Sequence, residues 1–159
     1  MKFKILLAIV MVFLSFIKIE SQNPVSFVDK YNPMAQELME KHNIPASVIL
    51  AISMLESGSG TSKLSRNKNN YFGVKKGNVY RGYENDSASF KDFCEIISRK
   101  KYYDYLTKNN IMDYNIWITK IQSGGYSVSK DWSTKVLFYI KKYKLYELDK
   151  QEDKQEILN

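Results

Sequence analysis

Cysteine and histidine are almost missing from this sequence of 159 residues, which holds one of each, Cys94 and His42. A single cysteine excludes an internal disulfide framework, and one residue of each kind is too few for a zinc site built from His and Cys. Cys94 falls on the apolar face of an expected helix, so we interpret it as an inert core residue. We therefore expect no metal ion and no other cofactor.

Glycine and proline are also scarce, with 7 and 3 residues, which excludes collagen-like repeats and long linkers. The 44% of hydrophobic residues argues against disorder, and the length fits one domain of roughly 100–200 residues. Acidic residues are fewer than basic ones, 17 against 24, and the net charge of +7 predicts attraction to an anionic partner. Because the lysines are spread along the chain, the pattern does not indicate a nucleic-acid patch.

The longest hydrophobic run lies at the N-terminus. Two lysines precede a run of 13 residues, Ile5–Ile17, that is apolar except for Ser15, and a polar stretch with the small residue Ser21 follows. This order is typical of a secretory signal peptide, and the run is shorter than the ~20 residues that a bilayer span needs. We predict that residues 1–21 are a signal peptide, and that the protein contacts the membrane only through this segment, before cleavage. The mature protein is expected to be secreted or periplasmic and associated with the cell wall. A buried helix or a retained N-terminal anchor is the alternative.

The spacing of apolar residues predicts a mainly α-helical single domain. A small hairpin is expected within residues 74–83, where Lys75-Lys76-Gly77-Asn78 lies between short apolar pieces. From Glu147 onward the chain is polar and is expected to fray. Helices are expected over residues 26–42 (with Pro33 as an alternative start), from Pro45 to the turn at Gly58, over 61–67, from Asp86 or Ser87 past Ile97, over 114–122 and over 130–143.

Glu56 is the leading candidate for a catalytic residue. It follows a helix that is apolar on nearly every side and precedes the glycine turn at Gly58 and Gly60. Partial burial and the negative end of the helix dipole both favour its protonated form. A glutamic acid that stays protonated near neutral pH is what general-acid catalysis at a glycosidic oxygen requires. From the spacing alone, a solvated Glu that merely ends a helix is the alternative interpretation.

Two loops combine amides or glycines with aromatic residues. The first is Asn69–Gly73, in which the amides could bind sugar hydroxyls and the rings could pack on pyranose faces; alternatively, Asn69 and Asn70 make turns and Phe72 belongs to the core. The second is Gly124-Gly125-Tyr126. It is either a helix stop followed by an aromatic residue or a Tyr lifted into a cleft.

In combination, these motifs resemble the N-acetylglucosaminidase domain of glycoside hydrolase family 73, to which flagellar rod-associated hydrolases and many bacterial autolysins belong. The resemblance extends over nearly all of the chain after residue 21. It rests on the Ile49–Ser62 stretch with Glu56-Ser57-Gly58, on Asn69–Lys75, Tyr80–Tyr83, Ser89–Phe93 and Gly124–Tyr126, and on the stretch from Lys141 to Tyr146.

The resemblance implies a lysozyme-like domain with a short β-hairpin lobe, over residues 26–146, followed by a polar tail over 147–159. The implied reaction is hydrolysis of the β-1,4 bond between N-acetylglucosamine and N-acetylmuramic acid in peptidoglycan glycan strands, by an enzyme that we expect to be monomeric. It assigns the general acid to Glu56 and a catalytic role to Tyr126. The residues implied in substrate binding are Ser57, Asn69, Asn70, Tyr71, Phe72 and Gly125.

Two features depart from the family pattern. Ser59 stands where the family usually has Trp, and the segment from Gly73 to Arg81 is short, whereas many relatives have a longer lobe there with a second acidic residue. Asp92 matches a family Asp that we interpret as structural. A substrate-assisted route or a water positioned by Tyr126 would need no second carboxylate. A lytic transglycosylase and a catalytically silent wall-binding module are the alternative functions.

Overall fold

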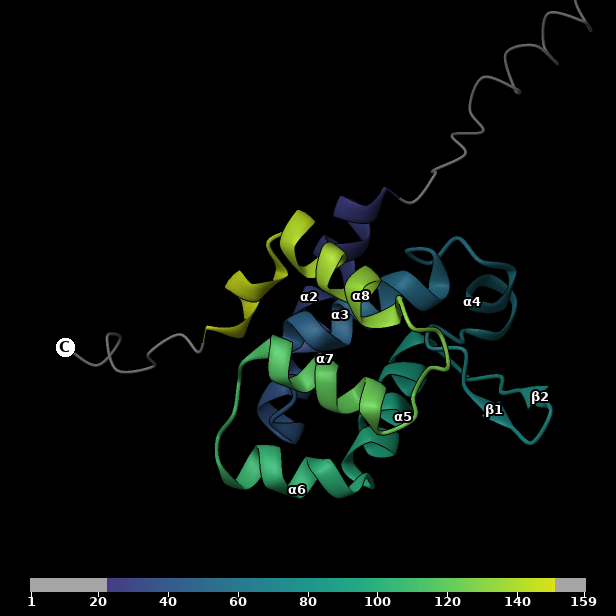
Figure 1. Cartoon of the computed structure of the whole chain (residues 1–159). Helices are drawn as coiled ribbons and strands as arrows, with labels where there is room; N and C mark the ends of the chain where they lie inside the picture. The colour runs from purple at the N-terminus through teal and green to yellow at the C-terminus, as the bar shows by residue number, and fades with distance from the viewer. Residues whose placement is uncertain (1–22, 151–159) are drawn as a thin grey trace, which may run out of the picture.

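A computed structural model describes residues 23–150. The predicted signal peptide, residues 1–21, and most of the predicted tail, residues 151–159, lie outside this range. The described chain forms seven α-helices, one short 3-10 helix and one hairpin (Figure 1). Their bounds are α2 Pro24–His42, α3 Ala46–Ser57, α4 Lys63–Lys68, β1 Lys75–Lys76, β2 Val79–Tyr80, α5 Asp86–Ser98, α6 Lys101–Lys108, α7 Tyr114–Ser123, α8 Trp132–Lys142 and η1 Leu145–Asp149.

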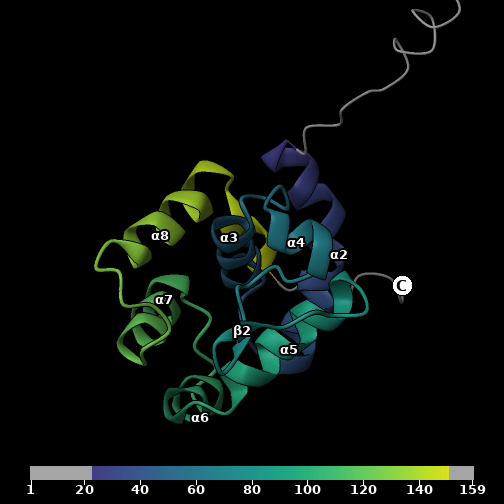
Figure 2. The same cartoon turned by 90° about the vertical axis from the view of Figure 1, so that its right-hand side faces the viewer.

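Helix α3 forms the centre of the domain. Its residues from Ala46 to Met54 are all buried, so it is surrounded by other elements on every side. It packs against α2, α7, α8 and η1, and Figure 2 shows it enclosed between α8 and the pair α2 and α4. The helix ends where Gly58 adopts the left-handed conformation. The structure confirms the predicted mainly α, lysozyme-like class.

Helix α2 begins at Pro24. The alternative prediction, that it begins at Pro33, is wrong. The Asn23 side chain accepts a hydrogen bond from the Val25 amide, and Pro24 occupies the first turn, where its missing N–H costs nothing. Pro33 lies inside the helix. It is exposed there, so water can bond the carbonyl that its missing amide leaves free.

The hairpin projects from the helical body (Figure 1). Lys75 pairs with Tyr80 and Lys76 with Val79, in antiparallel register. Its base is tied to α5, because Asp92 accepts hydrogen bonds from the Arg81 guanidinium at 2.5 Å and from the Tyr83 hydroxyl at 2.6 Å. Asp92 thus has the structural role that the sequence suggested.

The chain does not fray at Glu147, as the sequence had suggested, but continues through η1 to Asp149. The Asp149 carboxylate accepts hydrogen bonds from the amide and the hydroxyl of Ser47, at 2.8 and 2.6 Å. Helix α3 has no capping side chain of its own, since Pro45 precedes it. Asp149 therefore supplies the cap from the other end of the sequence.

No helix among residues 23–150 has both the length and the apolar character that a membrane span requires.

Candidate active site

Glu56 lies in the last turn of α3, half-buried at the edge of the core. Burial raises the pKa of its carboxyl group above the ordinary value, and the hydrogen bond from Trp132 opposes this rise. The helix C-terminus adds a negative electrostatic environment that also disfavours the anion. The acid is therefore biased toward its protonated form by its position at the end of a buried helix.

Trp132, the first residue of α8, holds one oxygen of Glu56. Its indole nitrogen donates a hydrogen bond to Oε1 at 2.9 Å, and the ring is 4% exposed. Because an indole N–H can only donate, Oε1 has to accept. The proton of the neutral acid is thereby directed to Oε2, the oxygen on the side of Gly73.

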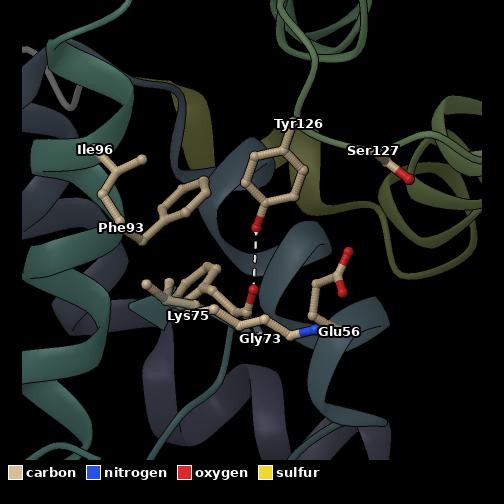
Figure 3. A pocket seen from close by; sticks show the side chains of 9 residues that line it. Glu56, Gly73, Lys75, Phe93, Ile96, Tyr126 and Ser127 are labelled. Atoms are coloured by element: carbon tan, nitrogen blue, oxygen red, sulfur yellow. Dashed lines mark hydrogen bonds between the residues drawn. The ribbon is translucent and has the colours of Figure 1, made fainter. Parts of the chain in front are cut away.

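Tyr126 lies in the loop between α7 and α8 and faces the same space as Glu56 (Figure 3). Its hydroxyl donates a hydrogen bond to the Phe72 carbonyl at 3.3 Å, and its ring packs against Trp132 at 5.2 Å between centroids. Burial, together with the nearby Glu56 carboxyl, raises the pKa of Tyr126 well above its ordinary value. The hydroxyl is therefore neutral at any physiological pH.

Glycines allow the chain to reach this arrangement. A Cβ on Gly124 would collide with the ring of Tyr102, and Gly125 has a φ of +83°, which side chains rarely adopt. Across the site, Gly73 has a φ of +65° and lies where a Cβ would be 3.7 Å from Oε2 of Glu56. The backbone on both sides can thus turn tightly beside the acid.

These residues border a cavity of about 340 Å³. Glu56 is the one acidic residue among the residues that line it, which are Glu56, Phe72, Gly73, Val74, Lys75, Phe93, Ile96, Tyr126 and Ser127 (Figure 3). Elsewhere in the described part of the chain, Asp92 is engaged by Arg81 and Tyr83. No group of three or more His, Cys, Asp or Glu side chains within residues 23–150 could hold a metal ion.

The structure brings together Glu56, Tyr126 and Phe72, and it places the other expected site residues outside the cavity lining. Ser57 is fully buried, where its hydroxyl donates to the Ser53 carbonyl and accepts from the Gly60 amide. Gly125 is exposed and precedes Tyr126.

The polar groups of the Asn69–Gly73 loop are also used within the protein. The Asn69 amide donates to the Tyr83 carbonyl at 3.0 Å. The buried Asn70 amide bonds both Val74 and Arg81. The Tyr71 hydroxyl shares a hydrogen bond of 2.8 Å with Tyr31. These three residues therefore shape the loop that presents Phe72 and Gly73.

Sequence reasoning missed Trp132 and Lys75 as parts of the site. Trp132 looked like one more apolar residue of the last helix. Lys75 looked like one of many lysines, although it directly follows the Asn69–Gly73 loop and Val74. The position of Lys75 beside a candidate sugar-binding loop was a usable signal, whereas nothing in the sequence links Trp132 to Glu56.

Most of the chain matches a known protein family. Residues 32–145 match the Glucosaminidase family, described as mannosyl-glycoprotein endo-beta-N-acetylglucosaminidase. The chain is 30% identical over 151 residues to the exo-glucosaminidase LytG of Bacillus subtilis, an alignment that covers 77% of this chain and 52% of LytG. The chain thus spans about half the length of that relative.

Solved structures share the fold. The catalytic domain of the autolysin Auto from Listeria monocytogenes superposes with a TM-score of 0.69 at 20% identity, covering 86% of this chain and 93% of that domain. An N-acetylmuramoyl-L-alanine amidase from Staphylococcus aureus superposes with a TM-score of 0.73 at 24% identity, covering 84% of this chain and 45% of that one. With the family match over most of its described residues, the chain belongs to the glucosaminidase family, glycoside hydrolase family 73.

Proposed function

We propose that this protein is an exported peptidoglycan hydrolase that cleaves the β-1,4 bond between N-acetylglucosamine and N-acetylmuramic acid. The observation that carries the proposal is a half-buried Glu56 whose Oε2 accepts no hydrogen bond from residues 23–150 and lies beside an open cavity. In this reaction Glu56 donates its proton to the glycosidic oxygen, so that the leaving sugar departs as an alcohol. The positive net charge of the chain favours binding to the anionic wall.

The second half of the reaction needs a nucleophile. Mechanisms with two carboxylates place the second at roughly 5–10 Å from the first, and the residues that line this cavity offer no second acid. We propose that a water held by Tyr126 attacks the anomeric carbon as its bond to the leaving oxygen breaks, or that the oxygen of the substrate's own N-acetyl group attacks first and water then opens the resulting oxazolinium ion. In both routes the water gives up a proton that restores the Glu56 acid. The neutral Tyr126 hydroxyl donates its proton to the Phe72 carbonyl, so its oxygen is left to accept a hydrogen bond from the water or from the N–H of the acetamido group.

The remaining residues of the motif take supporting roles in this proposal. Ser57 fixes the turn after Glu56, while Asn69, Asn70 and Tyr71 hold the loop whose Phe72 borders the cavity. Gly125 provides the bend that brings Tyr126 to the acid. Contact with sugar is then made by Phe72 and Tyr126.

The test is the replacement Glu56→Gln, with Glu84→Gln as the matched control on an exposed glutamate. Loss of a general acid should lower the release of reducing sugar from purified cell walls by about 100-fold or more. Glu84→Gln should keep the wild-type rate, and both variants should give the wild-type circular dichroism spectrum. Undiminished wall clearing by Glu56→Gln would remove Glu56 as the acid.

Mass spectrometry of the products determines which bond is cleaved and how. Reducing N-acetylglucosamine ends are expected of the proposed hydrolase, whereas 1,6-anhydromuramic ends would identify a lytic transglycosylase. The length distribution of the fragments separates cleavage within strands from cleavage at their ends. Export is tested separately, by sequencing the N-terminus of protein recovered from the medium, which should begin after Ser21.

A further inference from the structure

Lys75 is a cation at the edge of the catalytic cavity that has no carboxylate partner among residues 23–150. It is exposed on β1 and lines the same cavity as Glu56, and Figure 3 shows its side chain extending toward the side on which Glu56 lies. The ion pairs of the described chain use other cations, namely Lys30, Arg81, Arg99 and Lys135. The Lys75 ammonium is thus available to an anionic group that enters the cavity.

Tyr80 holds this ammonium in place. The Lys75 nitrogen lies 4.5 Å from the centre of the Tyr80 ring, and the two residues are direct partners in the hairpin register. Such a cation–π contact restricts a flexible side chain without removing its charge. Because the base of the hairpin is anchored to Asp92 through Arg81, the position of the pair is fixed relative to the helical body.

The chemistry of the proposed substrate brings an acidic group to this position. When Glu56 protonates the bond between N-acetylglucosamine and N-acetylmuramic acid, the oxygen that receives the proton is O4 of the muramic residue. The lactyl group that distinguishes muramic acid from N-acetylglucosamine is attached to O3, on the adjacent ring carbon. A pose that brings O4 to Glu56 therefore holds the lactyl group, with its carboxylate or peptide, a few atoms from the acid, and Lys75 lines the same cavity as Glu56.

We infer that Lys75, held by Tyr80, selects muramic acid in the leaving-group position by binding the carboxylate that its 3-O-lactyl substituent carries where no stem peptide is attached. This inference rests on the proposed function, and it assigns a specificity determinant to the hairpin. The ammonium acts as a point charge that favours an anionic substituent next to the scissile oxygen. A strand that lacks the negative charge at this position loses the interaction.

The experiment compares two forms of the same glycan strand. Strands freed of peptide carry lactyl carboxylates, and treatment with methylamine and a carbodiimide converts these groups to neutral amides. The wild-type protein should cleave the carboxylate form with a kcat/KM about fivefold higher, the size expected of one exposed charge pair. Lys75→Gln should cleave both forms at similar rates, and high salt should reduce the wild-type preference.

Matched variants separate this effect from general damage to the hairpin. Lys76 neighbours Lys75, but it does not line the cavity, so Lys76→Gln should keep the wild-type preference. Tyr80→Phe retains the ring and should also keep it, whereas Tyr80→Ala should weaken it. A Lys75→Gln variant that still prefers the carboxylate form overturns the inference and leaves the proposed function intact. If the wild-type protein releases no reducing ends from either form of the strand, this result contradicts the proposed function itself.

Discussion

The hydrogen bond from Trp132 to Glu56 should set the pH at which the enzyme loses activity. An indole N–H binds a carboxylate anion more strongly than a neutral acid, so the bond lowers the pKa of Glu56 against the rise caused by burial. Trp132→Phe keeps an aromatic ring against Tyr126 and removes the donor. The pKa of Glu56 should then rise, and the acid should stay protonated to higher pH.

The size of the change follows from the strength of such bonds. A hydrogen bond to a charged group is worth about 1.5–3 kcal/mol, and one pKa unit corresponds to about 1.4 kcal/mol. Part of the bond survives with the neutral acid, so we expect the alkaline limb of the kcat/KM profile to move upward by about one pH unit. The maximal kcat should fall, because the carboxyl group can now rotate and the proton is no longer confined to Oε2.

The assay is the initial rate of reducing-sugar release from purified peptidoglycan, measured across pH below the unfolding temperature of each variant. Trp117→Phe is the matched control, since Trp117 is fully buried and its indole donates to the Ile111 carbonyl at 2.7 Å, away from the cavity. That variant should lose stability and keep the wild-type alkaline limb. The reasoning is refuted if the limb of Trp132→Phe stays in place or moves down, or if Trp117→Phe shifts it equally.

Two further predictions concern stability. Burial raises the pKa of Glu56 in the folded state, so the folded protein is destabilised when the carboxyl group has to ionise. The free energy of unfolding is therefore highest below the unfolded pKa of Glu56 and falls as the pH rises through the folded pKa. The unfolding temperature of Glu56→Gln should therefore increase relative to wild type as the pH rises above the unfolded pKa of about 4.3, and a constant difference in a thermal series would contradict this. Asp149→Ala removes the cap of Ser47 and should cost about 1–2 kcal/mol in denaturant unfolding, while Glu147→Ala, on an exposed residue, should leave stability unchanged.

The sequence predicted those parts of the fold that depend on local patterns. The apolar character of residues 46–54 identified the central helix, and the glycines that follow predicted its end beside Glu56. Helix α6 was missed because Leu106 is its one buried residue and no side chain caps its start. The order at Asp149 was missed because its partner, Ser47, lies 102 positions away in the sequence.

The candidate site was predictable where a residue's own neighbourhood determines its role. Glu56 lies at the end of a helix before a glycine turn, Tyr126 follows a helix and two glycines, and the structure places both at one cavity. Asn70 shows the opposite case: an amide that bonds a sugar and an amide that bonds the backbone have the same local pattern. Which of the two occurs depends on Arg81, and the sequence does not reveal that the hairpin returns its carbonyl to Asn70.

These hydrogen bonds explain how the Asn69–Gly73 loop can determine the shape of the cavity although few of its residues line it. Asn70 bonds the amide and carbonyl of Val74 and the carbonyl of Arg81, so one buried side chain fixes both ends of the hairpin. The same loop presents the Phe72 carbonyl to Tyr126. Since a buried amide without partners costs about 1–3 kcal/mol, the loop has little freedom to adopt another shape. The geometry around the acid thus depends on polar groups that are bonded within the protein and do not line the cavity.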